Sequence, residues 1–248
     1  PERADGYLDL ARQHEGTLTG AHRQRFAMMF AAVRLSRALS GGDSSDIIAC
    51  ARRLLALAPA RPDGSDLGAS ALARMALGTA ALMAGDMAEA DRELTEAADQ
   101  AERVGLARVV QACVSRLALT RALRGELRAA ERYADRALAG DGGSERTHAY
   151  LALAAVNAQR DLPEAAEANL ALAGDLSTRE PGAAALAELI RAQVLHDRRD
   201  LTGSYQALLT GREIAGRSAS PLLTHGFAAV EAGLCLTRGD AGRAIRLL

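Results

Sequence analysis

The side chains that most often carry out catalysis are scattered along this chain of 248 residues. No two histidines have the H-x-x-x-H or H-E-x-x-H spacing that places both rings on one helix face to bind a metal ion. No G-x-S-x-G sequence is present to expose a nucleophilic serine on a sharp turn. Acidic pairs such as Glu164 and Glu167 have the spacing of a solvent-exposed helix face. We therefore expect neither enzyme activity nor a metal site. The histidines are His14, His22, His148, His196 and His225.

The cysteines give no sign of a structural or redox centre. Cys50, Cys113 and Cys235 are odd in number and lie far apart, which fits neither a disulfide framework nor a metal site. We expect free, buried thiols and a cytoplasmic location. No stretch without a charged residue exceeds 13 residues, which is too short to span a bilayer, and no signal peptide opens the chain. No membrane association is therefore expected.

The charge of the chain limits its partners. Thirty basic residues, all of them arginine, balance 31 acidic residues. Binding to nucleic acid requires clustered positive charge, so no direct contact with nucleic acid is expected. A phosphate-binding loop of the form G-x-x-x-x-G-K-[ST] requires a lysine, and the chain has none. We expect no cofactor in this chain.

The elements that would position any binding residues repeat along the chain. A turn of Gly or Arg and an acidic residue precedes an Ala-rich amphipathic segment, as at Gly85-Asp86 and Gly125-Glu126. The turns stand at 42, 85, 125, 160, 199 and 239, in steps of 43, 40, 35, 39 and 40 residues. Such a period is typical of stacked helical hairpins. The sequence predicts an all-α solenoid, a right-handed superhelix of tetratricopeptide-like hairpins.

Residues 1–248 are predicted to form one helical-repeat domain, with irregular helices over residues 1–66 and clearer repeats over residues 67–248. Two prolines and a glycine between Ala58 and Asp66 are typical of a linker or a long loop between helices. The expected helices are 2–14, 19–39 and 44–58, then the pairs 71–85 with 87–105, 106–124 with 127–139, 144–159 with 163–173, 181–198 with 201–215, and 221–238 with a last helix that begins at Asp240.

The copy from Ala71 to Gly105 is closest to the tetratricopeptide pattern, W-x2-L-G-x2-Y…A-x3-F…P. Leu77 and Gly78 match the L-G pair, while Ala90 and Leu94 match A-x3-F. We expect Gly78 and Ala90 to lie where the two helices of the hairpin come closest. Later copies have Ala130, Ala165, Ser204 and Ala244 at the position of Ala90. The predicted structural contacts of the repeat are Leu77, Gly78, Gly85, Ala90, Leu94, Ala97, Gly125 and Ala130.

Consecutive repeats resemble a known family most clearly between Ala71 and Ala173. The segments LGTAALMAGDMAEADRELTEAADQAERVGL and LALTRALRGELRAAERYADRAL are similar to the superhelical region of the large, maltose-regulator-like ATP-binding regulators of the LuxR family. In that family a P-loop ATPase precedes the superhelix and a helix-turn-helix follows it. The resemblance implies that this chain, which begins at Pro1 and ends within a repeat, is the middle module. ATP would then bind only to an upstream domain.

The resemblance implies a module for signal sensing, protein interaction and oligomerisation. Its inducer would be a small molecule, a peptide or a protein, bound on the concave surface formed by the first helix of each hairpin. The alternative is a tetratricopeptide scaffold that binds peptides or proteins outside transcription. The helix after Asp240 has no following neighbour in this chain, so self-association through that end is a further prediction. The residues expected to face the groove are Ser115, Arg116, Tyr150, Asn157, Gln193 and His196, and Arg121 lies on the same helix as the first two.

Three of these residues have structural alternatives: packing for Tyr150, a turn for Asn157 and a solvated helix end for His196. Only seven aromatic residues occur in the chain, so the resemblance is not extended to sugar binding by ring stacking. Phe26 and Phe30 are one helical turn apart and are expected in the core together with Met29.

Overall fold

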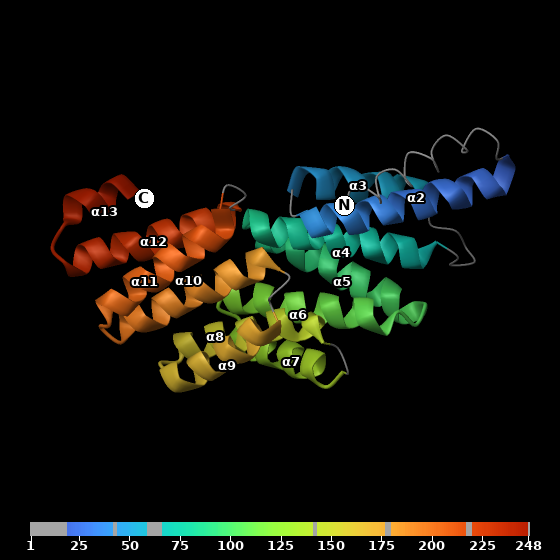
Figure 1. Ribbon diagram of the computed structural model, residues 1–248. Coiled ribbons are helices and arrows are strands. Elements are labelled where there is room, and N and C mark those ends of the chain that lie inside the picture. Colours follow the sequence, from blue (N-terminus) through green and yellow to red (C-terminus); the bar gives the residue numbers. More distant parts are fainter. Residues whose placement is uncertain are drawn as a thin grey trace.

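The structure of the protein is a computed structural model that describes residues 19–41, 44–58, 66–140, 143–176, 180–216 and 220–247. These residues form helices joined by turns, with no β-strand among them (Figure 1). The predicted all-α solenoid of tetratricopeptide-like hairpins is confirmed. The helix expected at 2–14 and the interior of the linker between Ala58 and Asp66 lie outside the described residues. The helices are α2 (Gly20–Gly41), α3 (Ser44–Leu57), α4 (Leu67–Ala84), α5 (Met87–Arg103), α6 (Ala107–Leu123), α7 (Leu127–Leu138), the short 3-10 helix η2 (Ser144–Arg146), α8 (Thr147–Gln159), α9 (Pro163–Leu176), α10 (Pro181–Asp197), α11 (Leu201–Ala215), α12 (Pro221–Thr237) and α13 (Ala241–Leu247).

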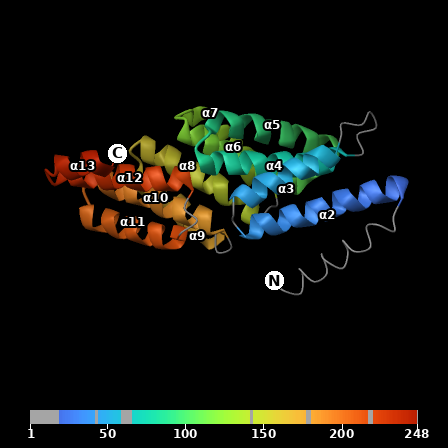
Figure 2. The ribbon, with the colours of Figure 1, turned by 90° about the horizontal axis from the view of Figure 1, so that it is seen from above.

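Successive hairpins contact each other through their first helices, α4, α6, α8, α10 and α12, each of which contacts the next, and through each second helix and the first helix that follows it (Figures 1 and 2). The array winds tightly enough that α12 returns to contact α4. At the start of α10, a Cβ atom added to Gly182 would lie 3.3 Å from Met83 Cε at the end of α4. One apolar core therefore runs from Leu82 in α4 to Leu234 in α12 and fills the centre of the array.

The turns within the hairpins share one pattern of backbone hydrogen bonds. In the turn between α4 and α5, Gly85 has a φ of 85°, in the left-handed region that favours glycine. The backbone N–H of Asp86 donates to the carbonyl of Ala81 at 2.9 Å, and the N–H of Gly85 donates to Leu82 at 3.0 Å. Together these bonds form a Schellman motif. The Asp86 carboxylate accepts a hydrogen bond from the Glu89 N–H at 3.0 Å and so caps α5. The same two backbone bonds close the turns at Gly125, Asp161, Arg199 and Gly239.

The third of these turns lies one residue later than the sequence spacing predicts. Arg160 keeps a negative φ of −98° at the end of α8, while Asp161 takes the left-handed conformation with a φ of 58°. Leu162 then stands where the other turns have an acidic residue. The buried small residue of α9 is consequently Ala166, and Ala165 is exposed. The turn positions in the described residues are therefore 85, 125, 161, 199 and 239, and the turn predicted at position 42 lies outside the described residues.

Small residues let the two helices of each hairpin approach closely. A Cβ atom on Gly78 would lie 2.6 Å from Leu94 Cγ and 3.1 Å from the Leu94 backbone nitrogen, distances at which atoms overlap. The copy after Arg199, which looks poor in the sequence, keeps this arrangement: Ser204 is fully buried and its hydroxyl donates to the Ala192 carbonyl at 2.7 Å. The fourth residue after each turn's cap position is buried throughout: Ala90, Ala130, Ala166, Ser204 and Ala244.

A second repeated contact joins successive hairpins. In each hairpin, the fifth residue after the cap position of the second helix faces an arginine of the next hairpin. That arginine lies within the first helix of the next hairpin or directly after its last residue. The hydrogen bond from Arg160 lowers the pKa of the Glu131 carboxyl. The pairs, with one nitrogen–oxygen distance each, are Asp91 with Arg121 (2.7 Å), Glu131 with Arg160 (2.7 Å) and Glu167 with Arg191 (3.4 Å), followed by Tyr205, whose ring centroid lies 6.0 Å from Arg238 Cζ.

The N-terminal helices α2 and α3 pack on α4 around a separate apolar cluster that includes Leu35 and Leu54. The prediction that Met29 lies in the core is wrong, because 70% of this residue is exposed. Phe26 and Phe30 are half-buried and stack on each other with ring centroids 6.2 Å apart. The sequence pattern of α2 is apolar on more than one face, so the helix period alone does not identify the buried one.

Among the described helices, α4 is the one long and apolar enough to cross a membrane by length and composition. It packs against α3, α5 and α6, and 44% of it is buried inside the protein. A core helix in a helical array meets the same criteria of length and composition.

We expect Gly78→Leu and Ala90→Leu each to lower the free energy of unfolding by about 1–3 kcal/mol, because the added carbons overfill the contact between α4 and α5. Chemical denaturation measures the change. Ala88→Leu, on the exposed face of α5, is the matched control and should have little effect. Equal stability of all three variants would show that the hairpin register is wrong.

Arg199→Gly should stabilise the protein by about 1 kcal/mol, because a left-handed φ is costly for any residue with a Cβ atom. Arg199 has a φ of 63°. The control is Arg198→Gly, since Arg198 has a φ of −74° and gains nothing from glycine. A thermal unfolding midpoint that rises for the first variant but not for the second is the expected result, and equal midpoints would contradict it.

Candidate binding groove

A groove of about 510 Å³ lies over the C-terminal halves of α8, α10 and α12, the first helices of their hairpins, and beside the end of α6. Its walls are apolar or small, and four polar side chains stand along it. We call this surface the concave groove. It is lined by Leu123, Ala155, Ala158, Gln159, Ile190, Gln193, His196, Asp197, Ala229, Val230 and Gly233.

The position of these residues follows from the hairpin turns. Each first helix is followed by a turn residue in the left-handed conformation. Most of the residues that line the groove precede that turn residue by two, six or nine positions. These offsets differ by four and three residues, so they share one face of an α-helix. On α10, for example, the offsets from Arg199 place Asp197, Gln193 and Ile190 on the groove side. The turn therefore fixes which face of each first helix meets the groove.

Small residues on α12 keep the groove open. Ala229 and Gly233 line its wall, and a Cβ atom on Gly233 would lie 3.5 Å from His196 Nε2, an ordinary contact distance. A longer side chain at either position would occupy the space between α10 and α12.

The polar groups of the groove differ in how many of their hydrogen bonds are already made within the protein. The Thr237 hydroxyl donates to the Gly233 carbonyl at 3.0 Å and lies 3.2 Å from His196 Nε2, so Nε2 carries the proton and donates to it. His196 Nδ1 lies 3.5 Å from Asp197 Oδ1. These contacts hold the His196 side chain at the end of α10.

Two carboxamides in the groove retain hydrogen-bonding capacity. Gln159 Nε2 donates to the Ala122 carbonyl at 3.0 Å, but its Oε1 accepts no hydrogen bond from the described residues. Gln193 is exposed, and its carboxamide has no hydrogen-bond partner in the described part of the chain. A ligand can therefore gain both donors and acceptors here without displacing an existing contact.

Of the predicted groove residues, the structure brings Gln193 and His196 together in the concave groove. Arg116 lies on the corresponding face of α6, two turns before Leu123. It is half-buried, and its guanidinium donates to the Ala112 carbonyl at 3.1 Å. Arg121 is used between hairpins, where it pairs with Asp91.

Three predicted residues lie elsewhere. Ser115 is fully buried between helices and does not line the groove. Tyr150 and Asn157 are seven residues apart and share a face of α8, but that face is about 200° from the one that carries Ala155. Tyr150 instead packs, half-buried, against the main core. Gln159 and Asp197, which do line the groove, could have been found from their place two residues before each turn residue.

Two buried titratable groups away from the groove have shifted pKa values. Burial raises the pKa of the Cys113 thiol to about 12. Burial, with a smaller effect of the nearby Arg116, holds the pKa of His148 well below its usual value. No group of three or more His, Cys, Asp or Glu side chains that could hold a metal ion occurs within the described ranges.

Comparison with known proteins identifies the fold. No family model and no curated protein matches the chain. Among solved structures, the apo form of RapI matches with a TM-score of 0.67 and 10% sequence identity, over 98% of this chain and 87% of that chain. At this identity the similarity shows the fold alone. The chain has a tetratricopeptide-like helical-repeat fold, similar to that of RapI.

Proposed function

We propose that the protein is an interaction module that binds a peptide, or an extended segment of a partner protein, in the concave groove. The observation that carries the proposal is the pair of carboxamides, Gln159 and Gln193, on apolar walls with hydrogen-bonding capacity to spare. Each residue of an extended peptide presents one N–H donor and one carbonyl acceptor, which a carboxamide matches on both sides.

The walls of the groove favour apolar side chains of such a peptide. Leu123, Ile190 and Val230 offer aliphatic surface, and the rim carries only one carboxylate, that of Asp197. A volume of about 510 Å³ holds a few side chains rather than a whole domain. None of the residues that line the groove is Phe, Tyr or Trp, so stacking of a sugar on a large aromatic ring is not favoured.

Within this proposal, we infer that the module belongs to a LuxR-type, ATP-dependent transcriptional regulator, as the sequence of its repeats suggests. Binding in the groove would bridge α8, α10 and α12 and so change the curvature of the array. A ligand shifts such an equilibrium only by its difference in affinity between the two curvatures. The ATPase and the DNA-binding domain, which would read this change, would lie outside this chain.

The gene sequence on either side of the chain tests that assignment. A phosphate-binding loop upstream and a helix-turn-helix of about 60 residues downstream are expected. If both are missing, the regulator assignment is wrong and the scaffold outside transcription takes its place.

Peptides selected from a displayed random library against the wild-type protein should bind about tenfold more weakly to Ala229→Leu, because the larger side chain fills the groove. Ala229 is exposed, so the change spares the core. Gln193→Ala should also weaken binding, because the peptide backbone loses a hydrogen-bonding partner.

The matched controls are Ala165→Leu on α9 and Gln206→Ala on α11, both exposed and outside the groove. Fluorescence anisotropy with labelled peptide gives the affinities. Selected peptides that bind all four variants equally well would locate their site elsewhere and refute the groove.

A further inference from the structure

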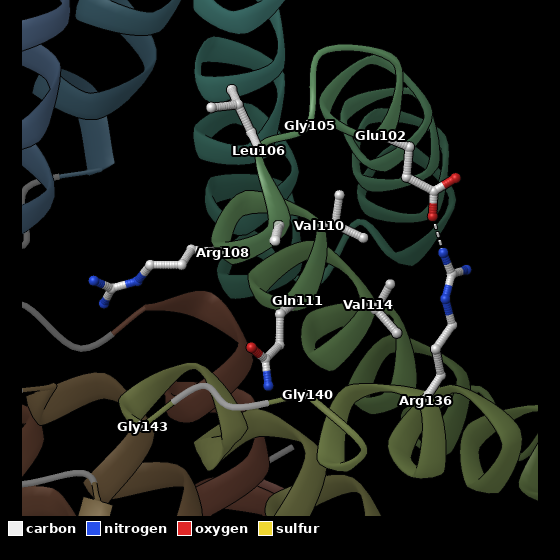
Figure 3. Close-up of a pocket in the computed structure, with 11 residues that line it drawn as sticks. Glu102, Gly105, Leu106, Arg108, Val110, Gln111, Val114, Arg136, Gly140 and Gly143 are labelled. Carbon is white, nitrogen blue, oxygen red and sulfur yellow. Dashed lines mark hydrogen bonds and ion pairs between the residues drawn. The ribbon is translucent and has the colours of Figure 1, made fainter.

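A larger cavity, of about 820 Å³, lies away from the concave groove and shares no residue with it (Figure 3). It lies where the C-terminal ends of α5 and α7 meet the N-terminal end of α6. It is lined by Glu102, Gly105, Leu106, Ala107, Arg108, Val110, Gln111, Val114, Arg136, Gly140 and Gly143. We call it the interhairpin cavity.

The cavity exists because α7 is short. Both α5 and α6 have 17 residues, whereas α7 has 12 and ends at Leu138. Since α7 runs back along α6, the first turns of α6 extend beyond it. Glycines at 105, 140 and 143 bring no side chains to fill this space. The gap is thus a consequence of helix length and of the residues in the connecting loops.

The floor of the interhairpin cavity is aliphatic. Val110 and Val114 point from α6 toward Glu102 and Arg136, whereas the Leu106 side chain points away from them toward α4 (Figure 3). None of the lining residues has an aromatic ring. This surface favours an aliphatic body of a ligand by burial of apolar area.

The polar groups of the cavity are balanced in charge. Arg136 from α7 pairs with Glu102 from α5 at the edge of the cavity, where both side chains are about half exposed (Figure 3). Gln111 Nε2 donates to the Ala137 carbonyl at 2.7 Å. Arg108 points away from the cavity and pairs with Glu145. A ligand head group at this edge therefore meets one positive and one negative charge.

We propose that the interhairpin cavity binds an uncharged small molecule with an aliphatic body and a hydrogen-bonding head group. The body would lie on Val110 and Val114, and the head group beside the Glu102–Arg136 pair, on the lone pairs and N–H groups that the pair leaves unused. A neutral head donates to the carboxylate and accepts from the guanidinium, whereas a charged head meets one like charge. The volume is in the range of small-molecule sites, about 300–1,000 Å³.

Such a ligand would act on the stacking of hairpins. The α4/α5 and α6/α7 hairpins contribute opposite walls of the cavity, and the pair Glu102–Arg136 joins them. A molecule held between them would fix their relative angle. This inference does not depend on peptide binding in the concave groove.

Three probes with one chain and different heads test the proposal: 1-octanol, octanoate and octylammonium, titrated into the protein by calorimetry. Octanol should bind saturably and about tenfold more tightly than either charged probe. Val110→Phe should abolish this binding by filling the cavity. Val33→Phe on α2, where the valine is 53% exposed, is the matched control and should bind octanol normally.

Two further variants test the head-group site. Glu102→Gln leaves Arg136 unopposed and should shift the preference toward octanoate by about tenfold, and Arg136→Gln should shift it toward octylammonium. Both residues are about half exposed, so the fold should tolerate the changes.

Octanol binding that does not saturate, or that is the same in Val110→Phe and Val33→Phe, would overturn the proposal. So would a head-group preference that neither charge variant alters. Ala229→Leu in the concave groove should leave octanol binding unchanged, so failure of one site is distinguishable from failure of the other.

Discussion

The close contact between the two helices of each hairpin is the constraint on which the rest of the structure depends. The fourth residue after each cap position is fully or almost fully buried, and in every copy it is alanine or serine. In the clearest copy, Gly78 opposite Leu94 leaves no room for a Cβ atom. This contact fixes the distance and rotation of the two helices. The rotation decides which side chains reach the core, the neighbouring hairpin and the concave groove.

Charged residues then maintain the order of the hairpins. The fifth residue after the cap position meets an arginine of the next hairpin, first as Asp91, Glu131 and Glu167, and finally as Tyr205. Each partly exposed pair contributes little to stability. The contact nevertheless recurs at the same position in four successive hairpins. Among the residues that line the concave groove, the one carboxylate is that of Asp197.

Local signals made most of the fold predictable. Glycine in the turns, aspartate at the caps and proline at the helix starts placed α11 at the expected residues and most other ends within a few. The groove was harder, because a shift of one residue turns a helix face by about 100°. The Arg160-Asp161-Leu162 turn has no glycine, and the spacing placed it one residue early. Tyr150 and Asn157 lie on a face of α8 other than the one that lines the concave groove. The interhairpin cavity depends on the relative lengths of three helices and on a pair between residues 34 apart in sequence, which no local pattern contains.

The return of α12 to α4 sets this protein apart from an open stack of repeats. In an open stack, contacts are confined to neighbours, so folding can nucleate in any repeat and spread in either direction. Here the contact between α4 and α12 joins segments separated by more than a hundred residues. The entropy lost in closing so long a loop is offset only after the intervening hairpins have formed. Long-range contacts of this kind slow folding and link distant segments. The central hairpins therefore connect α4 and α12 both along the chain and through space. A change that loosens any one of these hairpins destabilises the packing at both ends of the array.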